Sequence, residues 1–199
     1  MKYPKGIKNS TNNNVCYNHI PISFKNRGMD LETLINETNN YYIEKGIAYM
    51  YKKPTPIKLV SVDYKKGRIN EAYFMEPSTT DYNGLWNGKY VDFEAKETIN
   101  KTCFPIKNIH KHQIKHIINM HNNGGICFLI IKFKLLNETY LLMAEDFINY
   151  LNNNKSTIPH SYFMEKGYLI KDKFIPSVDY ISILENLGGK YEQSQEERK

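Results

Sequence analysis

Hydrophobic residues recur at helical spacing in two long segments of the chain. The first segment predicts a helix from about residue 31 to 45, with Asp30 as its N-cap and Gly46 at its end. Its apolar face would carry Leu31, Leu34, Ile35, Thr38 and Tyr42. The second predicts a helix from about 108 to 121, with one side made of Ile109, Gln113, His116, Ile117 and Met120. Shorter helices are expected at 145–151 and 179–187.

Runs typical of β-strands fill most of the chain between these helices. One strand is expected at 47–51, and the runs 57–64 and 69–77 predict a hairpin that turns at KKGR. The run 126–133, ICFLIIKF, is apolar almost throughout, as in a central strand covered on both faces, and 138–144 would be its neighbour. Helices and strands in this order predict an α/β protein with one mixed sheet.

The strand introduced by the turn Asn87–Gly88 alternates charged and apolar positions. In its run VDFEAKE, the side chains of Asp92, Glu94 and Lys96 would point to one face, and the apolar residues between them would pack on the other. Another carboxylate, Asp81, lies a few residues upstream. The apolar face is explained by packing, whereas the charged face needs a separate reason.

Length and composition favour one globular domain without a membrane span. The chain has 199 residues, of which 41% are hydrophobic, and it contains no stretch of about 18 apolar residues. Its first residues are basic, but no apolar core follows them as in a secretory signal, so we expect a cytoplasmic protein. The three cysteines, Cys16, Cys103 and Cys127, are odd in number and unpaired in spacing, which indicates reduced thiols.

The charge is compatible with a polyanionic partner such as DNA. The formal net charge is +6 and the pI is about 9.0. Residues 1–26 are expected to form a disordered basic, Asn-rich arm, 27–187 a single domain and 188–199 a polar tail. The candidate phosphate contacts in these segments are Arg27, Lys52, Lys53, Lys65, Lys66 and Arg68.

The charged residues near Asp81 match the needs of phosphodiester hydrolysis. That reaction uses hard oxygen ligands for Mg²⁺, a means of activating water and a cation near the developing negative charge. Asp81, twelve intervening residues and then Glu94-Ala95-Lys96 form the D–(D/E)xK signature of the restriction-endonuclease-like nucleases. On its own this signature is also compatible with a solvated strand face.

The signature lies within a series of segments that read, in order, NRGMDLETLINETNNYY, KKPTPIKLVSVDY, EAYFMEPSTTDYNG, GKYVDFEAKET, HKHQIKH, GGICFLI and DYISILE. Together these segments closely resemble the RecU family of Holliday junction resolvases over about residues 27–187. The resemblance implies a restriction-endonuclease-like mixed sheet flanked by helices, with a projecting hairpin stalk at about 57–77. It also implies a Mg²⁺-dependent endonuclease that resolves Holliday junctions by paired symmetric nicks in recombination and repair.

The resemblance also implies roles for individual residues. The metal positions fall on Thr79, Asp81, Glu94 and Gln113, which would hold one or two Mg²⁺ or Mn²⁺ ions, and the lysine that stabilises the transition state falls on Lys96. Asp92 either belongs to this site or hydrogen-bonds the neighbouring hairpin, and Glu37 either supports the site or lies on a solvated helix face. The spacing of His112 and His116 permits a zinc site, but no nearby Cys or carboxylate completes one.

The implied partners are a four-way DNA junction and a second copy of the chain, and a RecA-type recombinase is a further candidate. A junction has two-fold symmetry and needs two cuts, which matches a homodimer with one site per subunit. Two other functions stay open. One is a non-catalytic protein that binds junctions or modulates a recombinase, which would not need clustered carboxylates, and the other is a site-specific restriction-type nuclease.

Overall fold

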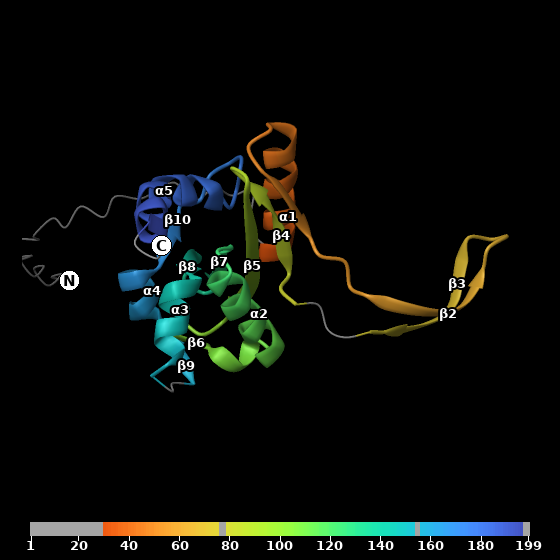
Figure 1. Cartoon of the computed structure of the whole chain (residues 1–199). Coiled ribbons are helices and arrows are strands. Elements are labelled where there is room, and N and C mark those ends of the chain that lie inside the picture. The colour runs from red at the N-terminus through yellow and green to blue at the C-terminus, as the bar shows by residue number, and fades with distance from the viewer. Residues whose placement is uncertain (1–29, 76–78, 154–155, 197–199) are drawn as a thin grey trace, which may run out of the picture.

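The computed structural model describes residues 30–75, 79–153 and 156–196 (Figure 1). The arm predicted at 1–26, and Arg27, lie outside the described residues. The helices are α1 (Leu31–Glu44), α2 (Lys111–Asn122), α3 (Ala144–Leu151), α4 (His160–Lys166) and α5 (Tyr180–Glu196), with a 3-10 turn η2 (Ile106–Asn108). The strands are β1 (Tyr49–Lys52), β2 (Ile57–Asp63), β3 (Arg68–Phe74), β4 (Tyr82–Trp86), β5 (Lys89–Thr98), β6 (Cys103–Pro105), β7 (Ile126–Phe133), β8 (Glu138–Met143), β9 (Thr157–Pro159) and β10 (Tyr168–Ile170).

The body is built on a six-stranded sheet with the order β1-β4-β5-β7-β8-β10. The central pair β5–β7 is parallel, and the other neighbours in the sheet are antiparallel. The strand predicted at 126–133 is observed with those bounds and is buried along almost its whole length. The predicted α/β class with a mixed sheet is confirmed.

Helices cover both faces of this sheet. On one face, Phe93 of β5 and Phe128 of β7 pack against Tyr180 of α5, with ring centroids 5.1 and 5.8 Å away, in a core that also includes α1. On the other face, Leu129 belongs to a second core that includes residues of α2, α3 and α4. Because Glu94 pairs with Leu129 in the parallel register, the charged side of β5 faces the α2 layer.

Helix α1 begins where the sequence predicts. Asp30 accepts a 2.8 Å hydrogen bond from the backbone N–H of Thr33, which satisfies a donor at the helix N-terminus. The helix ends before Gly46, whose φ of +65° is readily adopted by glycine. The apolar face predicted for this helix is buried against the sheet.

The hairpin β2–β3 forms a separate two-stranded sheet and extends away from the body (Figure 1). Its strands pair in antiparallel register with irregularities around Ser61, and every residue of β3 is exposed. Asp63 Oδ1 accepts hydrogen bonds from the backbone N–H groups of Lys65 and Lys66 at 3.1 and 3.2 Å, which fixes the turn. The predicted projecting hairpin is therefore present, with its basic residues at the tip.

The C-terminal helix is longer than predicted. We expected it to end near Leu187 because Gly188 and Gly189 follow, but α5 continues to Glu196, so most of the predicted polar tail is helical. The polar residues after the glycines are compatible with a helix, and the apolar periodicity on which the prediction relied ends before them. None of the helices in the described ranges is long and apolar enough to cross a membrane. Cys103 and Cys127 are free thiols, and Cys16 lies outside those ranges.

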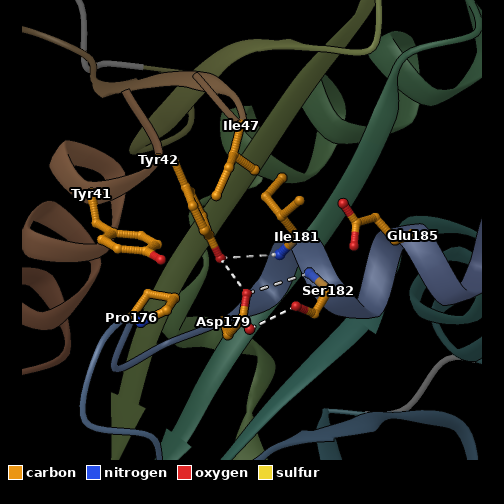
Figure 2. Close-up of a pocket in the computed structure, with 8 residues that line it drawn as sticks. All are labelled: Tyr41, Tyr42, Ile47, Pro176, Asp179, Ile181, Ser182 and Glu185. Carbon is orange, nitrogen blue, oxygen red and sulfur yellow. Dashed lines mark hydrogen bonds between the residues drawn. The ribbon is translucent and has the colours of Figure 1, made fainter. Parts of the chain in front are cut away.

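A pocket of about 210 Å³ lies between α1 and α5 (Figure 2). Among its lining residues, Asp179 accepts a 2.8 Å hydrogen bond from Tyr42 and a 2.6 Å hydrogen bond from Ser182. Lys173, which does not line the pocket, donates a further 2.6 Å hydrogen bond to Asp179. Burial opposes the charge on Asp179, but these hydrogen bonds outweigh it and lower the pKa of that carboxyl. The pocket belongs to the α1–α5 core, on the opposite side of the sheet from the charged face of β5.

Candidate active site

The charged face of β5 forms as the alternation predicts. Val91 and Phe93 have no exposed surface and belong to the α1–α5 core, whereas Asp92, Glu94 and Lys96 point to the other side. Pairing of β4 with β5 then brings the residue before β4, Asp81, to the same place.

Asp81, Glu94 and Lys96 meet in one cluster. The ammonium of Lys96 lies 3.2 Å from Asp81 Oδ2 and also forms an ion pair with Glu94 Oε1. The backbone N–H of Asp81 donates a 3.1 Å hydrogen bond to Glu94 Oε2. Two carboxylates, one just before β4 and one in the middle of β5, therefore share one cation.

Burial sets the electrostatics of this cluster. Glu94 has no exposed surface, and burial together with the charge of Asp81 raises its pKa to about 8 even though Lys96 opposes the shift. Burial also disfavours the charge of Lys96, but the two carboxylates outweigh it and raise the pKa of the ammonium. Lys96 is thus a stable cation at neutral pH, beside a carboxyl group that takes up a proton unusually easily.

Gln113 reaches the cluster from α2. Its side chain is buried, and Nε2 donates a 2.8 Å hydrogen bond to Glu94 Oε1. Its amide oxygen accepts a 2.9 Å hydrogen bond from the backbone N–H of His110, as part of a capping box at the start of the helix. Gln113 is close to the predicted metal ligands, but in this geometry its nitrogen, and not its oxygen, faces Glu94.

Thr79 and Asp92 belong to a second group beside the cluster. Lys53 donates hydrogen bonds to Thr79 Oγ1 at 3.0 Å and to Asp92 Oδ2 at 2.8 Å. Asp92 has no exposed surface and also contacts Thr80, Tyr90 and His116. Tyr90, which donates to Asp92, lies on β5 itself, and among the residues that the structure describes no hydrogen bond joins Asp92 to the hairpin β2–β3 or to Asp81, Glu94 or Lys96.

Several predicted residues have other surroundings. The side chain of Lys53, expected to contact DNA phosphates, is only 14% exposed and turns inward to Asp92, because a buried carboxylate needs a cation. Lys52 forms an ion pair with Glu32 on α1 but keeps 42% of its side chain exposed. Glu37 is exposed on α1 and makes no hydrogen bond to the cluster within the described part of the chain. The tip residues Lys65, Lys66 and Arg68 lie on the projecting hairpin.

The two histidines whose spacing permits a zinc site, His112 and His116, have separate environments. His116 Nε2 lies 3.0 Å from Asp92 Oδ2, whereas the ring of His112 stacks on that of His110 with centroids 5.4 Å apart. No group of three or more His, Cys, Asp or Glu side chains is arranged to hold a metal ion within the described ranges. The candidate metal site at Asp81 and Glu94 therefore depends on two carboxylates and on neutral oxygen donors.

Two neighbours of Asp92 were not predicted. The sequence contains a signal for each of them. Thr80 directly precedes Asp81 in STTD, and Tyr90 lies two positions before Asp92, on the same face of the strand as Asp92 and Glu94. Their importance depends on Asp92 being buried, which the sequence pattern does not reveal.

Comparison with known proteins agrees with this arrangement. The family model "Recombination protein U" matches residues 26–186, a range that contains both groups of residues. The chain belongs to the RecU family. The Holliday junction resolvase RecU of Geobacillus kaustophilus is 47% identical over 194 residues, which are 94% of this chain and 97% of the relative.

Relatives in another genus are equally similar to this RecU-family chain. The Holliday junction resolvase RecU of Streptococcus thermophilus is 49% identical over 173 residues, covering 84% of this chain and 87% of the relative. That of Streptococcus gordonii is 45% identical over 196 residues, covering 95% and 98%. The resemblance inferred from the sequence motifs is confirmed.

Proposed function

We propose that this RecU-family chain is a Mg²⁺-dependent endodeoxyribonuclease that resolves Holliday junctions by paired symmetric nicks during homologous recombination and DNA repair. The observation that carries the proposal is the convergence of Asp81, Glu94 and Lys96 where the start of β4 meets the middle of β5. A merely solvated strand face would not leave Glu94 without exposed surface. The names of the relatives, Holliday junction resolvases, support the same substrate.

The donor set at Asp81 and Glu94 fits a hard divalent cation. Burial and the charge of Asp81 raise the pKa of Glu94 to about 8, so two ionised carboxylates in this site oppose one another. A divalent cation held by both would remove that repulsion, and oxygen ligands suit Mg²⁺ and also Mn²⁺. Thr79 could add a hydroxyl or carbonyl oxygen, and Gln113 would orient Glu94 through its 2.8 Å hydrogen bond.

The bound cation and Lys96 would have different roles in hydrolysis. When bound, the cation would neutralise charge on the scissile phosphate and help to activate the attacking water. The Lys96 ammonium would stabilise the negative charge that develops around phosphorus in the transition state. Because the neighbouring carboxylates raise the pKa of Lys96, it would act as a fixed cation and not as a proton acceptor.

A homodimer is part of the proposal because the hairpin β2–β3 exposes apolar side chains. Leu59, Val60 and Ile69 are each about half exposed, and Phe74 is 83% exposed. A two-stranded hairpin is marginally stable alone in water, and exposed apolar side chains gain free energy when a second chain covers them. A two-fold dimer would also set two identical sites against a substrate with two-fold symmetry.

The remaining contacts follow from charge and location. Lys65, Lys66 and Arg68 at the hairpin tip would contact phosphates of the junction without reading its sequence. A RecA-type recombinase stays a candidate partner for which the described surface identifies no residue. We place the enzyme in the cytoplasm, where the chromosomal DNA of a bacterium lies.

Cleavage of a synthetic four-way junction beside linear duplex of the same sequence tests this proposal. Each of the four strands would be labelled in turn, and reactions would contain either Mg²⁺ or EDTA. We expect Mg²⁺-dependent nicks at symmetric positions on two opposite strands, with the duplex intact. Equal cutting of the duplex would indicate a restriction-type nuclease, and tight junction binding without cutting would indicate a non-catalytic binding protein; either result would overturn the proposal.

A further inference from the structure

Asp92 is a buried carboxylate with an unusually full set of partners. Lys53 Nζ and Tyr90 Oη each donate to Oδ2 at 2.8 Å, and His116 Nε2 lies 3.0 Å from the same oxygen. Thr80 donates to the other oxygen, Oδ1. Four protein groups therefore surround this carboxylate, three at Oδ2 and one at Oδ1, against the roughly four acceptor sites that an ionised carboxylate offers.

These partners come from parts of the chain that are distant in sequence. Lys53 follows β1, Thr80 precedes β4, Tyr90 lies on β5, and His116 lies on α2. Replacing a buried ion pair by apolar residues is often neutral or stabilising, so stability alone is a weak reason for such a group. Because all four segments hydrogen-bond or contact the Asp92 carboxylate, it fixes their positions relative to one another.

One set of hydrogen bonds connects Asp92 to the segment that carries Asp81. The Lys53 ammonium donates to Thr79 Oγ1 at 3.0 Å and to Thr80 Oγ1 at 2.6 Å, and the backbone N–H of Lys53 donates to the carbonyl of Asp81 at 2.8 Å. The segment 79–81 is thus tied through its side-chain and main-chain groups to Lys53 and Asp92. Its last residue carries one of the two carboxylates of the candidate active site.

A second set of contacts, through α2, connects Asp92 to Glu94. His116 lies one helical turn after Gln113 on α2, so both residues face β5. Gln113 donates to Glu94, and His116 contacts Asp92 two positions earlier on the same strand. The helix is therefore aligned against β5 through two adjacent side chains of the same strand face.

We infer that Asp92 is a positioning residue of the nuclease site, which acts through Thr80 and Lys53 to hold Asp81 at the distance from Glu94 that a divalent cation requires. The inference rests on the proposed function. Positional errors of about 1 Å in a reacting group can reduce rates by about 10²-fold, so a support of this kind has measurable consequences. Among the described residues no hydrogen bond or ion pair joins Asp92 to Asp81, Glu94 or Lys96, so we assign it a positioning role and not a catalytic one.

Thr80→Val and Tyr90→Phe form a matched pair of variants for the test. Each removes one hydroxyl that donates to Asp92, but only the Thr80 hydroxyl lies on the segment that carries Asp81. Thr80→Ser keeps the hydroxyl and serves as the rescue. Asp92→Asn removes the charge, and its melting temperature shows whether it folds.

The measurements are Mn²⁺ affinity without DNA, by calorimetry, and the single-turnover cleavage rate at saturating metal. We expect Thr80→Val to weaken Mn²⁺ binding about tenfold or more and to lower the rate about 10–100-fold, whereas Tyr90→Phe and Thr80→Ser stay within about threefold of the parent. If Thr80→Val lowers only the melting temperature, or if Tyr90→Phe is equally impaired, the inference is wrong.

The parent protein in the same experiment distinguishes failure of the proposed function from failure of the positioning role. A parent that neither binds Mn²⁺ nor cuts the junction would overturn the proposed function and this inference with it. A parent that binds and cuts, with Thr80→Val unaffected, would overturn the positioning role alone.

Discussion

The backbone N–H of Asp81 donates a 3.1 Å hydrogen bond to Oε2 of Glu94. This bond joins the start of β4 to the middle of β5 and keeps one carboxylate within reach of the other. Because the Lys96 ammonium contacts both side chains, the three residues behave as one electrostatic unit. Substitutions of its individual members should therefore have different and measurable effects.

Replacing Lys96 should affect the chemical step far more than DNA binding. If the ammonium stabilises charge that develops only in the transition state, Lys96→Ala should lower the single-turnover rate by about 10²–10³ with little change in junction affinity. Lys96→Arg keeps the charge but changes its reach and donor geometry, so a substantial loss there would indicate that position matters as well. A rate for Lys96→Ala within about threefold of the parent would remove Lys96 from the mechanism.

The raised pKa of Glu94 predicts how stability depends on pH. A carboxyl whose pKa is higher in the folded protein stabilises it fully below the unfolded value, and that contribution is lost as the pH rises through the folded value of about 8. Glu94→Gln, which carries no charge, should therefore gain unfolding free energy relative to the parent between pH 5 and pH 8, on the order of 1–3 kcal/mol. Urea unfolding of both proteins in EDTA at the two pH values measures this difference.

If the difference in unfolding free energy between Glu94→Gln and the parent is the same at pH 5 and pH 8, the raised pKa of Glu94 is contradicted. In the parent, Lys96 stays charged across the range because Glu94 and Asp81 raise its pKa against the effect of burial. Titrating groups that do not interact with Glu94 are common to both proteins and cancel in the difference, so the difference reports the coupled unit of Glu94, Asp81 and Lys96.

The hairpin tip should contribute to the salt dependence of junction binding. Removal of one phosphate contact should reduce the slope of log affinity against log salt concentration by about one, so the triple replacement of Lys65, Lys66 and Arg68 by Ala should reduce it by up to about three. Fluorescence anisotropy of a labelled junction over a range of salt concentrations measures the slope. Identical slopes for variant and parent would mean that the tip does not touch the DNA backbone.

Apolar residues on the hairpin should matter for self-association. Phe74 is 83% exposed on β3, so Phe74→Asp would place a charge in the proposed dimer contact, and we expect a dissociation constant raised about tenfold or more. Leu135→Asp, at a residue that is 62% exposed on the body, is the matched control and should leave the constant unchanged. Sedimentation equilibrium measures both; equal behaviour of the two variants, or a monomeric parent, would contradict the role of the hairpin.

Local patterns predicted much of the fold. The buried strand 126–133, the capped start of α1 at Asp30 and the alternation along β5 all depend on neighbours in the sequence, and each is observed. Strand β4 was not predicted, although its Gly84 has a structural reason: an added Cβ would lie 2.0 Å from the carbonyl oxygen of Tyr49 on β1. That close approach is visible only once the strands are paired.

In the candidate site, too, some features follow from local sequence and others depend on residues far apart in the chain. The carboxylates and Lys96 follow from a short motif, but the inward turn of Lys53 depends on Asp92, which lies 39 residues away in the sequence. Local sequence supports only the ordinary interpretation of Lys53 as a surface lysine near DNA. Burial of Asp92, produced by α2 and the segment before β4, decides otherwise.

Asp81 and Glu94 are central to the proposed mechanism because they would hold the divalent cation needed for junction cleavage. Single-turnover cleavage of a fixed four-way junction by Asp81→Asn, with binding measured in the same samples, tests this role most directly. Loss of one ligand charge should remove several kcal/mol of transition-state stabilisation, a decrease on the order of 10³-fold or more in rate, while the dissociation constant for the junction stays within about threefold of the parent. Cleavage by Asp81→Asn at the parent rate in ordinary Mg²⁺ would contradict the proposed metal site.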